Sequence, residues 1–233
     1  MDIRGMAAIV TGGSSGLGAA TAAHLASQGA KVTLFDVNEE SGTAHAASIG
    51  GQFARVDVTQ EADVLAGLAK GREAHGPARI LVNCAGIGPG SKTVGRKGPH
   101  SLDLFSKVIT INLIGTFNCL RLAAAEMVEL DPLEGDERGV IINTASIAAY
   151  EGQMGQVAYS ASKGGIVGMT LPAARDLSRS GVRVCTIAPG IFYTPLLMGL
   201  PQEVQDSLGQ SVPFPSRLGD PAEFASLAGH IVT

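Results

Sequence analysis

Short apolar segments alternate along the chain with longer segments of helical character, and this alternation restricts the possible folds most. The apolar segments are 6–11, 31–35, 52–56, 79–83, 139–145 and 182–188. They are apolar almost throughout, which is typical of parallel strands that helices cover on both faces. Repeated strand–helix units form right-handed crossovers. The sequence therefore predicts an α/β fold, in which residues 1–233 form a single doubly wound domain with a parallel sheet.

Composition and charge narrow the class of protein. Of the 233 residues, 45% are hydrophobic and 16% are charged, so the chain can bury a large core. The formal net charge is −4 and no basic block is interleaved with aromatic residues, which argues against a nucleic-acid partner. No apolar run approaches the roughly 18 residues that span a bilayer, and the first strand begins too early for a targeting peptide.

The three cysteines are Cys84, Cys119 and Cys185, and they lie far apart in apolar stretches. No pair has the spacing of metal ligands, and buried free thiols are typical of a reducing compartment. We therefore expect a cytoplasmic protein without a metal site and without a membrane partner.

The segment TGGSSGLG, residues 11–18, lies between the first strand and the first helix and contains Gly12, Gly16 and Gly18. Glycine permits a tight turn, and the helix N-terminus offers unpaired N–H groups to a dinucleotide pyrophosphate. Asp36 ends the second strand, where a carboxylate accepts from a ribose diol and repels a 2′-phosphate. The pattern predicts NAD as the cofactor. A plain turn and a solvated acid are the alternatives.

Two further segments follow predicted strands at the same edge of the sheet. Asp57 in DVT could accept from the adenine amino group, although the same letters also form an ordinary helix cap. The segment NCAG, residues 83–86, has small residues that would let a dinucleotide lie close to the backbone. A structural turn explains that segment almost equally well.

Tyr159 and Lys163 lie one turn apart if residues 157–177 form a helix. A phenol that acts as a base near neutral pH needs its pKa lowered by about three units, or about 4 kcal/mol. A cation about 4 Å away supplies about 4 kcal/mol at an effective dielectric constant of about 20. We therefore expect Lys163 to lower the pKa of Tyr159.

Ser146 and Asn112 complete the candidate catalytic set. Ser146 follows the fifth strand, so it should lie at the same sheet edge and could donate to a substrate oxygen. With Tyr159 and a dinucleotide, this suits oxidation of an alcohol to a ketone. Ser146 could instead cap a helix. Asn112 is a polar residue in an apolar helical stretch, where it either ties down backbone or holds a water leading to Lys163.

In their order along the chain, TGGSSGLG, NCAG, INLIGTFN, Ser146 and YSASK resemble the motifs of the short-chain dehydrogenase/reductase family. The resemblance implies a single Rossmann-type domain with a seven-stranded parallel sheet, hydride transfer to nicotinamide and usually a homotetramer. It implies that Tyr159 is the base and that Ser146 orients the substrate. It also implies that Lys163 binds the nicotinamide ribose and lowers the tyrosine pKa, and that Asn112 holds a proton-relay water.

Longer segments, such as CAGIGPGSKT and TIAPGIFYTPLL, resemble those family members that oxidise 3-hydroxyacyl-CoA and also hydroxysteroids. That resemblance places Gln153 against the substrate. It implies contacts with NAD from Ser15, Leu17, Asp36, Asp57, Val58, Cys84, Phe192 and Thr194. The loop 91–100 adds Lys92, Arg96 and Lys97, which could meet the phosphates of coenzyme A or form a solvated loop.

The family usually continues past a helix like the one expected near the C-terminus into a last strand, yet this chain ends at Thr233. Without that strand, segment 182–188 would be an exposed apolar edge. Segment 191–217 is apolar and contains proline, so as a substrate loop it would fit an acyl chain or a steroid equally. We expect NAD-dependent oxidation of a 3-hydroxyacyl-CoA to a 3-oxoacyl-CoA. The alternatives are a dehydrogenase of hydroxysteroids or other secondary alcohols and a non-catalytic NAD-binding scaffold.

Overall fold

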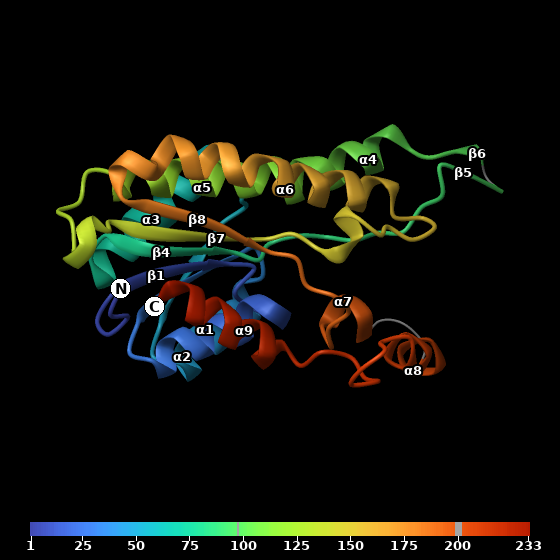
Figure 1. Cartoon of the computed structure of the whole chain (residues 1–233), viewed down its shortest axis with the longest axis horizontal. Helices are drawn as coiled ribbons and strands as arrows, with labels where there is room; N and C mark the ends of the chain where they lie inside the picture. Colours follow the sequence, from blue (N-terminus) through green and yellow to red (C-terminus); the bar gives the residue numbers. More distant parts are fainter. Residues whose placement is uncertain (97, 199–201) are drawn as a thin grey trace.

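The computed structural model describes residues 1–96, 98–198 and 202–233, which form a parallel sheet with helices on both faces (Figure 1). In spatial order β3-β2-β1-β4-β7-β8, the strands are Gln52–Arg55, Lys31–Asp36, Ala7–Thr11, Ala78–Asn83, Gly139–Thr144 and Val182–Ile187. Each of the predicted strands is confirmed within one residue at either end. The strand order reverses between β1 and β4, where doubly wound sheets bind their ligands.

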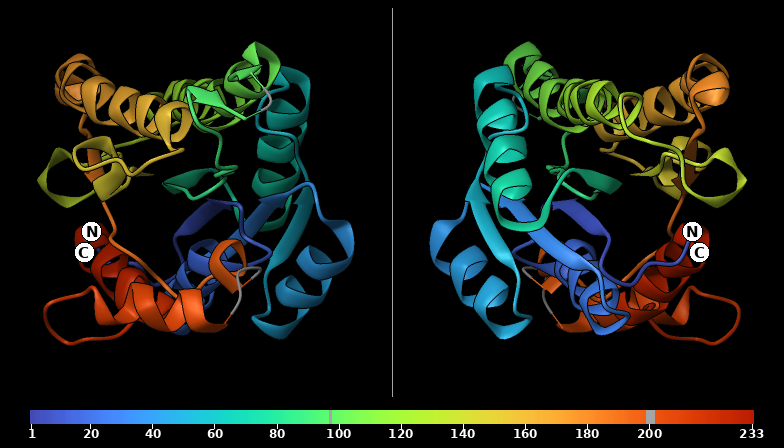
Figure 2. Two further views of the ribbon diagram at one scale, coloured as in Figure 1. Left: turned by 90° about the vertical axis from the view of Figure 1, so that its right-hand side faces the viewer. Right: turned by 90° about the vertical axis from the view of Figure 1, so that its left-hand side faces the viewer.

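The helices form two layers, which Figure 2 shows edge-on. One face of the sheet carries α1 (Gly16–Ser27), α2 (Glu39–Ser48) and α9 (Pro221–Val232). The other face carries α3 (Glu61–His75), α4 (Leu102–Ile109), α5 (Gly115–Met127) and α6 (Val157–Leu177). Successive residues of β1 enter different cores: Val10 packs with Leu25 and Phe224, and Ile9 packs with Leu120. Burial on both faces explains why the strands are apolar throughout.

A π-helical segment, η1 (Thr110–Ile114), joins α4 and α5 into one continuous helix from Leu102 to Met127. By length and mean hydropathy, 1.5 over its most apolar window, this helix could span a membrane, contrary to the sequence-based expectation that no run does so. Half of that window is buried, because the helix packs against β4, α3 and α6. Its apolar character is therefore that of a helix that covers a sheet.

Strand β8 is the last strand of the described sheet, which has six strands where the family resemblance implied seven. In the described residues β8 is the edge of the sheet, as expected. Its apolar side chains Val182, Val184 and Ile187 are nevertheless buried. Helix α6 packs against β8, while Ile187 joins the core cluster on the opposite face that contains Phe224. Helices on the two faces of the sheet therefore cover the apolar side chains of this edge strand.

Two short excursions extend beyond the carboxyl ends of the strands, to the right in Figure 1. One is the antiparallel pair β5 (Val94–Gly95) and β6 (Gly98–Pro99), which the sequence did not predict. The other contains α7 (Pro195–Met198) and α8 (Gln202–Gln210) within the predicted substrate loop. The 3-10 helices are η2 (Glu134–Asp136), η3 (Ile147–Ala149) and η4 (Ser178–Ser180).

Candidate active site

The glycine loop between β1 and α1 is built from close backbone approaches. A Cβ atom on Gly18 would collide with the carbonyl oxygen of Gly12, and one on Gly12 would lie 2.8 Å from the amide nitrogen of Ala85. Gly12 and Gly16 also have positive φ angles, 64° and 53°. These positions therefore require glycine, as the sequence predicted.

The N-terminus of α1 has the features of an anion site. Within the described residues, no side chain caps this end of the helix, and its first turn contains no acidic residue. Helices α2, α3, α4 and α9 each have an acidic residue in the first turn. The first-turn N–H groups and the helix dipole of α1 therefore favour a bound anion such as a pyrophosphate. The structure thus fits a dinucleotide at this loop.

Asp36 lies at the end of β2, next to the glycine loop, as predicted. Its Oδ2 accepts hydrogen bonds from the backbone nitrogen of Ser14 (3.1 Å) and from the Ser14 hydroxyl (2.5 Å). Its Oδ1 accepts from the backbone nitrogen of Asn38 (3.0 Å). The carboxylate is thereby fixed between two loops of the candidate cofactor site.

Asp57 and Val58 follow β3 and approach the same edge. The Oδ1 atom of Asp57 accepts from the backbone nitrogen and hydroxyl of Thr59, at 2.9 and 2.7 Å, in a local turn. The N-cap residue of the following helix α3 is Gln60, so the helix-cap alternative for Asp57 is wrong. Val58 is buried, and its carbonyl oxygen accepts from the side-chain nitrogen of Asn118. Contacts of Asp57 and Val58 with adenine stay predictions.

The segment NCAG forms the turn after β4 and borders the catalytic residues. The Cys84 backbone nitrogen donates to the carbonyl oxygen of Thr11, and the Cys84 thiol accepts from the Thr144 hydroxyl at 3.5 Å. Burial raises the pKa of Cys84 to about 11, so this residue is a neutral thiol at physiological pH. A Cβ atom on Gly86 would lie 3.2 Å from Asn112 Oδ1 and 3.8 Å from Lys163 Nζ, so the small residue lets this turn approach both.

Helix α6 brings Tyr159 and Lys163 together, as the spacing predicted. The Lys163 Nζ lies 5.7 Å from the centre of the Tyr159 ring. It donates a 2.6 Å hydrogen bond to the carbonyl oxygen of Thr144, the last residue of β7. Burial lowers the pKa of Lys163 to about 8, and the nearby Cys84 opposes this shift.

The pKa of Tyr159 differs from the sequence-based expectation. Burial of the hydroxyl raises this pKa, and a hydrogen bond with Ser146 opposes the rise. The expected lowering by Lys163 is therefore not seen, because the ammonium group is directed to the Thr144 carbonyl. A lower tyrosine pKa would require further positive charge at the site.

Ser146 has the capping role that the sequence left open, while its role toward the substrate stays a prediction. Its hydroxyl accepts from the backbone nitrogen of Ala148 at 3.1 Å and so caps η3. The same side chain is hydrogen-bonded to Tyr159, which joins the end of β7 to the start of α6. Ser146, Tyr159 and Lys163 therefore meet at one point of the sheet edge.

Asn112 is fully buried in the π-helical segment, where its side chain binds backbone. Its Oδ1 accepts from Ile87 N at 2.8 Å, while its Nδ2 donates to Ile87 O at 2.9 Å and to the Ser162 hydroxyl at 3.0 Å. The first of the two sequence-based alternatives is thus confirmed. The water-holding role stays a prediction.

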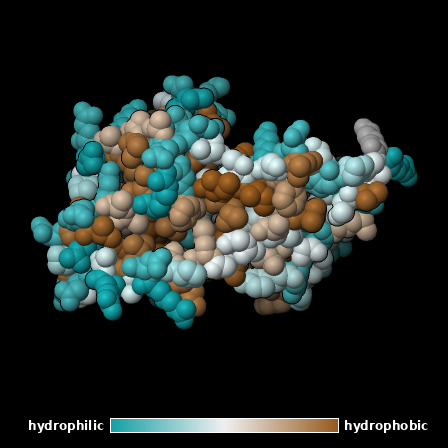
Figure 3. Space-filling model, turned by 90° about the horizontal axis from the view of Figure 1, so that it is seen from above, coloured by the Kyte–Doolittle hydropathy of each residue, from teal (hydrophilic) through white to brown (hydrophobic). Residues whose placement is uncertain are grey.

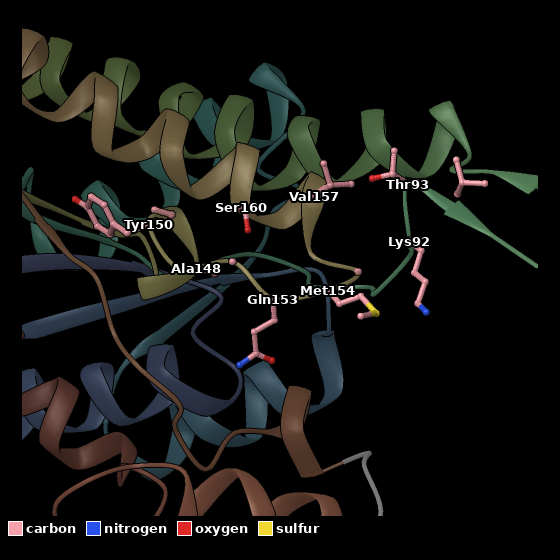
Figure 4. Close-up of a pocket in the computed structure, with 12 residues that line it drawn as sticks. Lys92, Thr93, Ala148, Tyr150, Gln153, Met154, Val157 and Ser160 are labelled. Atoms are coloured by element: carbon pink, nitrogen blue, oxygen red, sulfur yellow. The ribbon is translucent and has the colours of Figure 1, made fainter.

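A cavity of about 530 Å³ lies beside the N-terminal end of α6 (Figure 4). Gln153, Lys92 and Met154 line it, and their side chains point away from α6 in Figure 4. Gln153 thus borders a space that a substrate could enter. Arg96 is exposed on the excursion that carries β5, and Lys97 lies outside the described residues.

The segment after β8 contacts the glycine loop. A Cβ atom on Gly16 would lie 3.5 Å from the Thr194 side chain, so Thr194 lies over the start of α1. Phe192 packs edge-to-face against Phe224, with ring centres 6.4 Å apart. Leu17 packs against the core cluster on the α1 side of the sheet. Ser15, whose side chain is exposed, is the N-cap residue of α1.

Sequence reasoning missed three residues whose hydrogen bonds hold the site residues in place. Ser14 bonds to Asp36, Thr144 bonds to Lys163, and Ser162 bonds to Asn112. The position of Ser14 inside the glycine loop was a signal that could have identified it. Thr144 acts through its backbone carbonyl, so its residue type carried no signal. The Ser162 contact spans distant parts of the chain.

A model of the family described as short chain dehydrogenase matches residues 6–205. The chain belongs to the short-chain dehydrogenase family. Two similar relatives are 3-hydroxyacyl-CoA dehydrogenase type-2 from Bos taurus, 56% identical, and from Homo sapiens, 55% identical; each alignment covers 99% of this chain and 90% of the relative. A crystal structure of 3-hydroxyacyl-CoA dehydrogenase type-2 from Mycobacterium avium superposes with a TM-score of 0.92 and 42% identity, over 98% of this chain and 90% of that one.

Membership of this family confirms the fold and the resemblance inferred from the motifs. The short-chain dehydrogenase is an oxidoreductase, and enzymes of this family use nicotinamide dinucleotides, NAD or NADP, as cofactors. The glycine loop and the uncapped start of α1 are the parts of this chain that fit such a cofactor.

Proposed function

We propose that this short-chain dehydrogenase oxidises a 3-hydroxyacyl-CoA to a 3-oxoacyl-CoA with NAD. The observation that carries the proposal is the meeting of Ser146, Tyr159 and Lys163 beside the glycine loop. The relatives named 3-hydroxyacyl-CoA dehydrogenase type-2, similar along nearly the whole chain, support this substrate class.

The residues of the site divide the chemistry between them. Bound NAD supplies the acceptor for the hydride that leaves C3 of the substrate. Tyr159 takes the proton of the C3 hydroxyl, so oxidation removes one proton and one hydride and leaves a ketone. Ser146, already hydrogen-bonded to Tyr159, holds the substrate oxygen next to the phenol. The Lys163 ammonium would donate hydrogen bonds to the nicotinamide ribose, and the further positive charge of bound NAD would favour the phenolate form of Tyr159.

Asp36 supports NAD in preference to NADP. A carboxylate at the end of β2 accepts from the ribose hydroxyls and repels a 2′-phosphate. The glycine loop contains neither arginine nor lysine, and Val37 follows Asp36, so no adjacent cation in the sequence offsets this repulsion.

Gln153 and Lys92 support the acyl-CoA part of the proposal. Both line the cavity beside α6, and the Lys92 ammonium and the exposed Arg96 supply positive charge near it for the coenzyme A phosphates. The segment 191–217 would cover the acyl chain, since Thr194 lies over the glycine loop. Lys97 would add a further cation.

A substrate panel tests the proposal directly. NADH formation is followed with 3-hydroxyacyl-CoA thioesters, the matching free 3-hydroxy acids, hydroxysteroids and simple secondary alcohols. The proposal predicts the highest kcat/KM for the thioesters. Equal rates for thioesters and free acids would overturn the substrate class, and a preference for steroids would favour the alternative dehydrogenase. Binding of NAD without turnover of any alcohol would favour the scaffold.

The apolar outer face of α4, α5 and α6 supports the further proposal of a homotetramer. Apolar residues gather over these helices when the molecule is seen from above (Figure 3). Ile114, Phe117 and Leu171 on this face are each about half exposed. Burial of such residues favours association of subunits. Light scattering should give the tetramer mass for the wild type and a smaller mass for Phe117→Glu.

A further inference from the structure

The turn that follows β3 leaves one backbone donor without a partner. The nitrogen of Asp57 donates to the Asp63 carboxylate at 3.0 Å, and that of Gln60 donates to the Asp57 carbonyl oxygen at 2.9 Å. The nitrogen of Thr59 donates to Oδ1 of Asp57 at 2.9 Å. Within the described residues, the Val58 nitrogen has no hydrogen-bond partner. Because an unpaired buried N–H group is costly, we expect this one to bind a ligand acceptor.

An acceptor lies beside this donor in the same turn. The Asp57 carboxylate uses Oδ1 for Thr59, whereas Oδ2 has no partner in the described part of the chain. A free N–H group next to a free carboxylate oxygen matches the edge of adenine, where a ring nitrogen accepts and the neighbouring amino group donates. The turn is therefore suited to the adenine of a dinucleotide.

Helix α5 holds this turn through one amide. Asn118 Nδ2 donates to the Val58 carbonyl oxygen at 2.9 Å, and both residues are buried. Gly115, one turn earlier on α5, permits the close approach, because a Cβ atom there would lie 2.6 Å from Cγ2 of Val58. A buried hydrogen bond is electrostatically stronger than one in water. The Val58 carbonyl is therefore fixed relative to α5.

A charged pair sets the orientation of the Asn118 amide. Arg121 Nη2 donates to Asn118 Oδ1 at 2.8 Å and to the Glu61 carboxylate at 2.7 Å. Because a guanidinium can only donate, the amide oxygen faces Arg121, and the NH₂ group is turned toward Val58. Glu61 is the first residue of α3. A closed chain of contacts thus runs from the turn to α5 and back to the start of α3.

We infer that Asn118 is a positioning residue for the adenine end of the cofactor: it fixes the Val58 carbonyl and, through it, the direction of the Val58 N–H group. The inference rests on the proposed use of NAD. Without the Asn118 amide, the turn keeps its internal hydrogen bonds, but the Val58 N–H group loses its fixed direction toward the adenine ring nitrogen. Discrimination of adenine from another base should then fall.

Calorimetric titration of the full chain with two dinucleotides tests the inference without a substrate. NAD is compared with its hypoxanthine analogue, in which the ring nitrogen carries a hydrogen atom and an oxygen replaces the amino group, so the donor and the acceptor are exchanged. The wild type should bind NAD about tenfold more tightly than the analogue. In Asn118→Leu, NAD binding should weaken by about three- to tenfold and analogue binding by less than about twofold.

Two arginine variants separate this role from a structural one. Arg121→Met removes the group that orients the amide, so it should lower the preference for NAD in the same direction by a smaller factor. Arg72→Met is the matched control, because Arg72 and Glu126 form another ion pair between α3 and α5. It should leave both dissociation constants unchanged.

The outcomes distinguish the inference from the proposed function. A wild type that binds neither dinucleotide would overturn the proposed cofactor, and the inference with it. Equal binding of the two by the wild type, a full preference for NAD in Asn118→Leu, or an equal loss of both affinities in that variant would overturn the inference alone. If Asn118→Leu does not fold, Arg121→Met decides, and an unchanged preference in Arg121→Met would overturn the inference.

Discussion

The Lys163 ammonium donates a 2.6 Å hydrogen bond to the Thr144 carbonyl and lies 5.7 Å from the centre of the Tyr159 ring. The last residue of β7 thus fixes the position of the lysine on α6. Because Ser146, two residues after Thr144, bonds to Tyr159, one strand end holds both members of the α6 pair. The geometry of the site is therefore set by the junction of β7 and α6.

Replacement of Tyr159 by phenylalanine removes the proton acceptor and keeps the ring. We expect kcat to fall by about a thousandfold, which is the contribution of a positioned acid or base. The NAD dissociation constant and the melting temperature should stay close to those of the wild type. Steady-state kinetics and calorimetry measure these quantities, and retention of more than about a tenth of the activity would exclude Tyr159 as the base.

The buried Lys163 should make stability depend on pH. Its pKa falls from 10.5 to about 8 on folding, so between these values the unfolded state binds more protons than the folded state. The free energy of unfolding should therefore rise with pH, by on the order of 1 kcal/mol per unit from this group. Below about pH 8 both states are protonated and the slope from Lys163 vanishes.

Two buried thiols limit the window for this measurement. Burial raises the pKa of Cys84 to about 11 and that of Cys119 to about 12. Above about pH 9 the thiols ionise in the unfolded state but not in the folded state, so they lower the free energy of unfolding as the pH rises. Urea unfolding between about pH 8 and 9 should show the slope in the wild type and in Lys31→Met, an exposed-lysine control. Lys163→Met should lack it, and an equal slope in Lys163→Met would contradict the assignment.

Asn112→Ala should destabilise the fold by about 2–4 kcal/mol, because the partly buried N–H and C=O groups of Ile87 and the buried hydroxyl of Ser162 lose their partner. The control Asn38→Ala removes an exposed helix cap and should cost about 1 kcal/mol. Urea unfolding measures both values. If Asn112→Ala lowered the free energy of unfolding by no more than Asn38→Ala does, water would have replaced the hydrogen bonds of the Asn112 side chain.

Gly18→Ala should prevent the glycine loop from closing, since the added Cβ meets the backbone carbonyl of Gly12, which cannot move aside cheaply. We expect weaker NAD binding and a lower melting temperature. Gly168→Ala is the matched helical control: its Cβ meets nothing within 4 Å, so it should stabilise α6 by about 0.5–1 kcal/mol. Calorimetry measures NAD binding by both variants, and thermal unfolding measures their stability. Normal NAD binding by Gly18→Ala would contradict the assignment of the glycine loop as the cofactor site.

The strands could be predicted from the sequence because burial on both faces leaves a continuous apolar pattern. Glycine spacing located the dinucleotide loop for a similar reason, since Gly12 and Gly18 have no room for a side chain. Tyr159 and Lys163 were found because helical periodicity is local. These features each depend on residues close together in the chain.

The features that sequence reasoning missed depend on contacts between distant segments. The raised pKa of Tyr159 follows from its depth in the fold and from the direction of the Lys163 ammonium, which spacing does not determine. The hydroxyl bond from Ser14 to Asp36 connects two loops. The π-helical turn at Asn112 likewise forms where its amide reaches Ile87.

The most direct test of the proposed reaction follows one hydrogen atom. A short-chain 3-hydroxyacyl-CoA carrying deuterium at C3 is incubated with NAD and the enzyme, and the reduced cofactor is analysed by mass spectrometry. The account predicts one deuterium in each reduced cofactor for every 3-oxoacyl-CoA formed. Reduced cofactor without the label, or 3-oxoacyl-CoA without reduced cofactor, would contradict it.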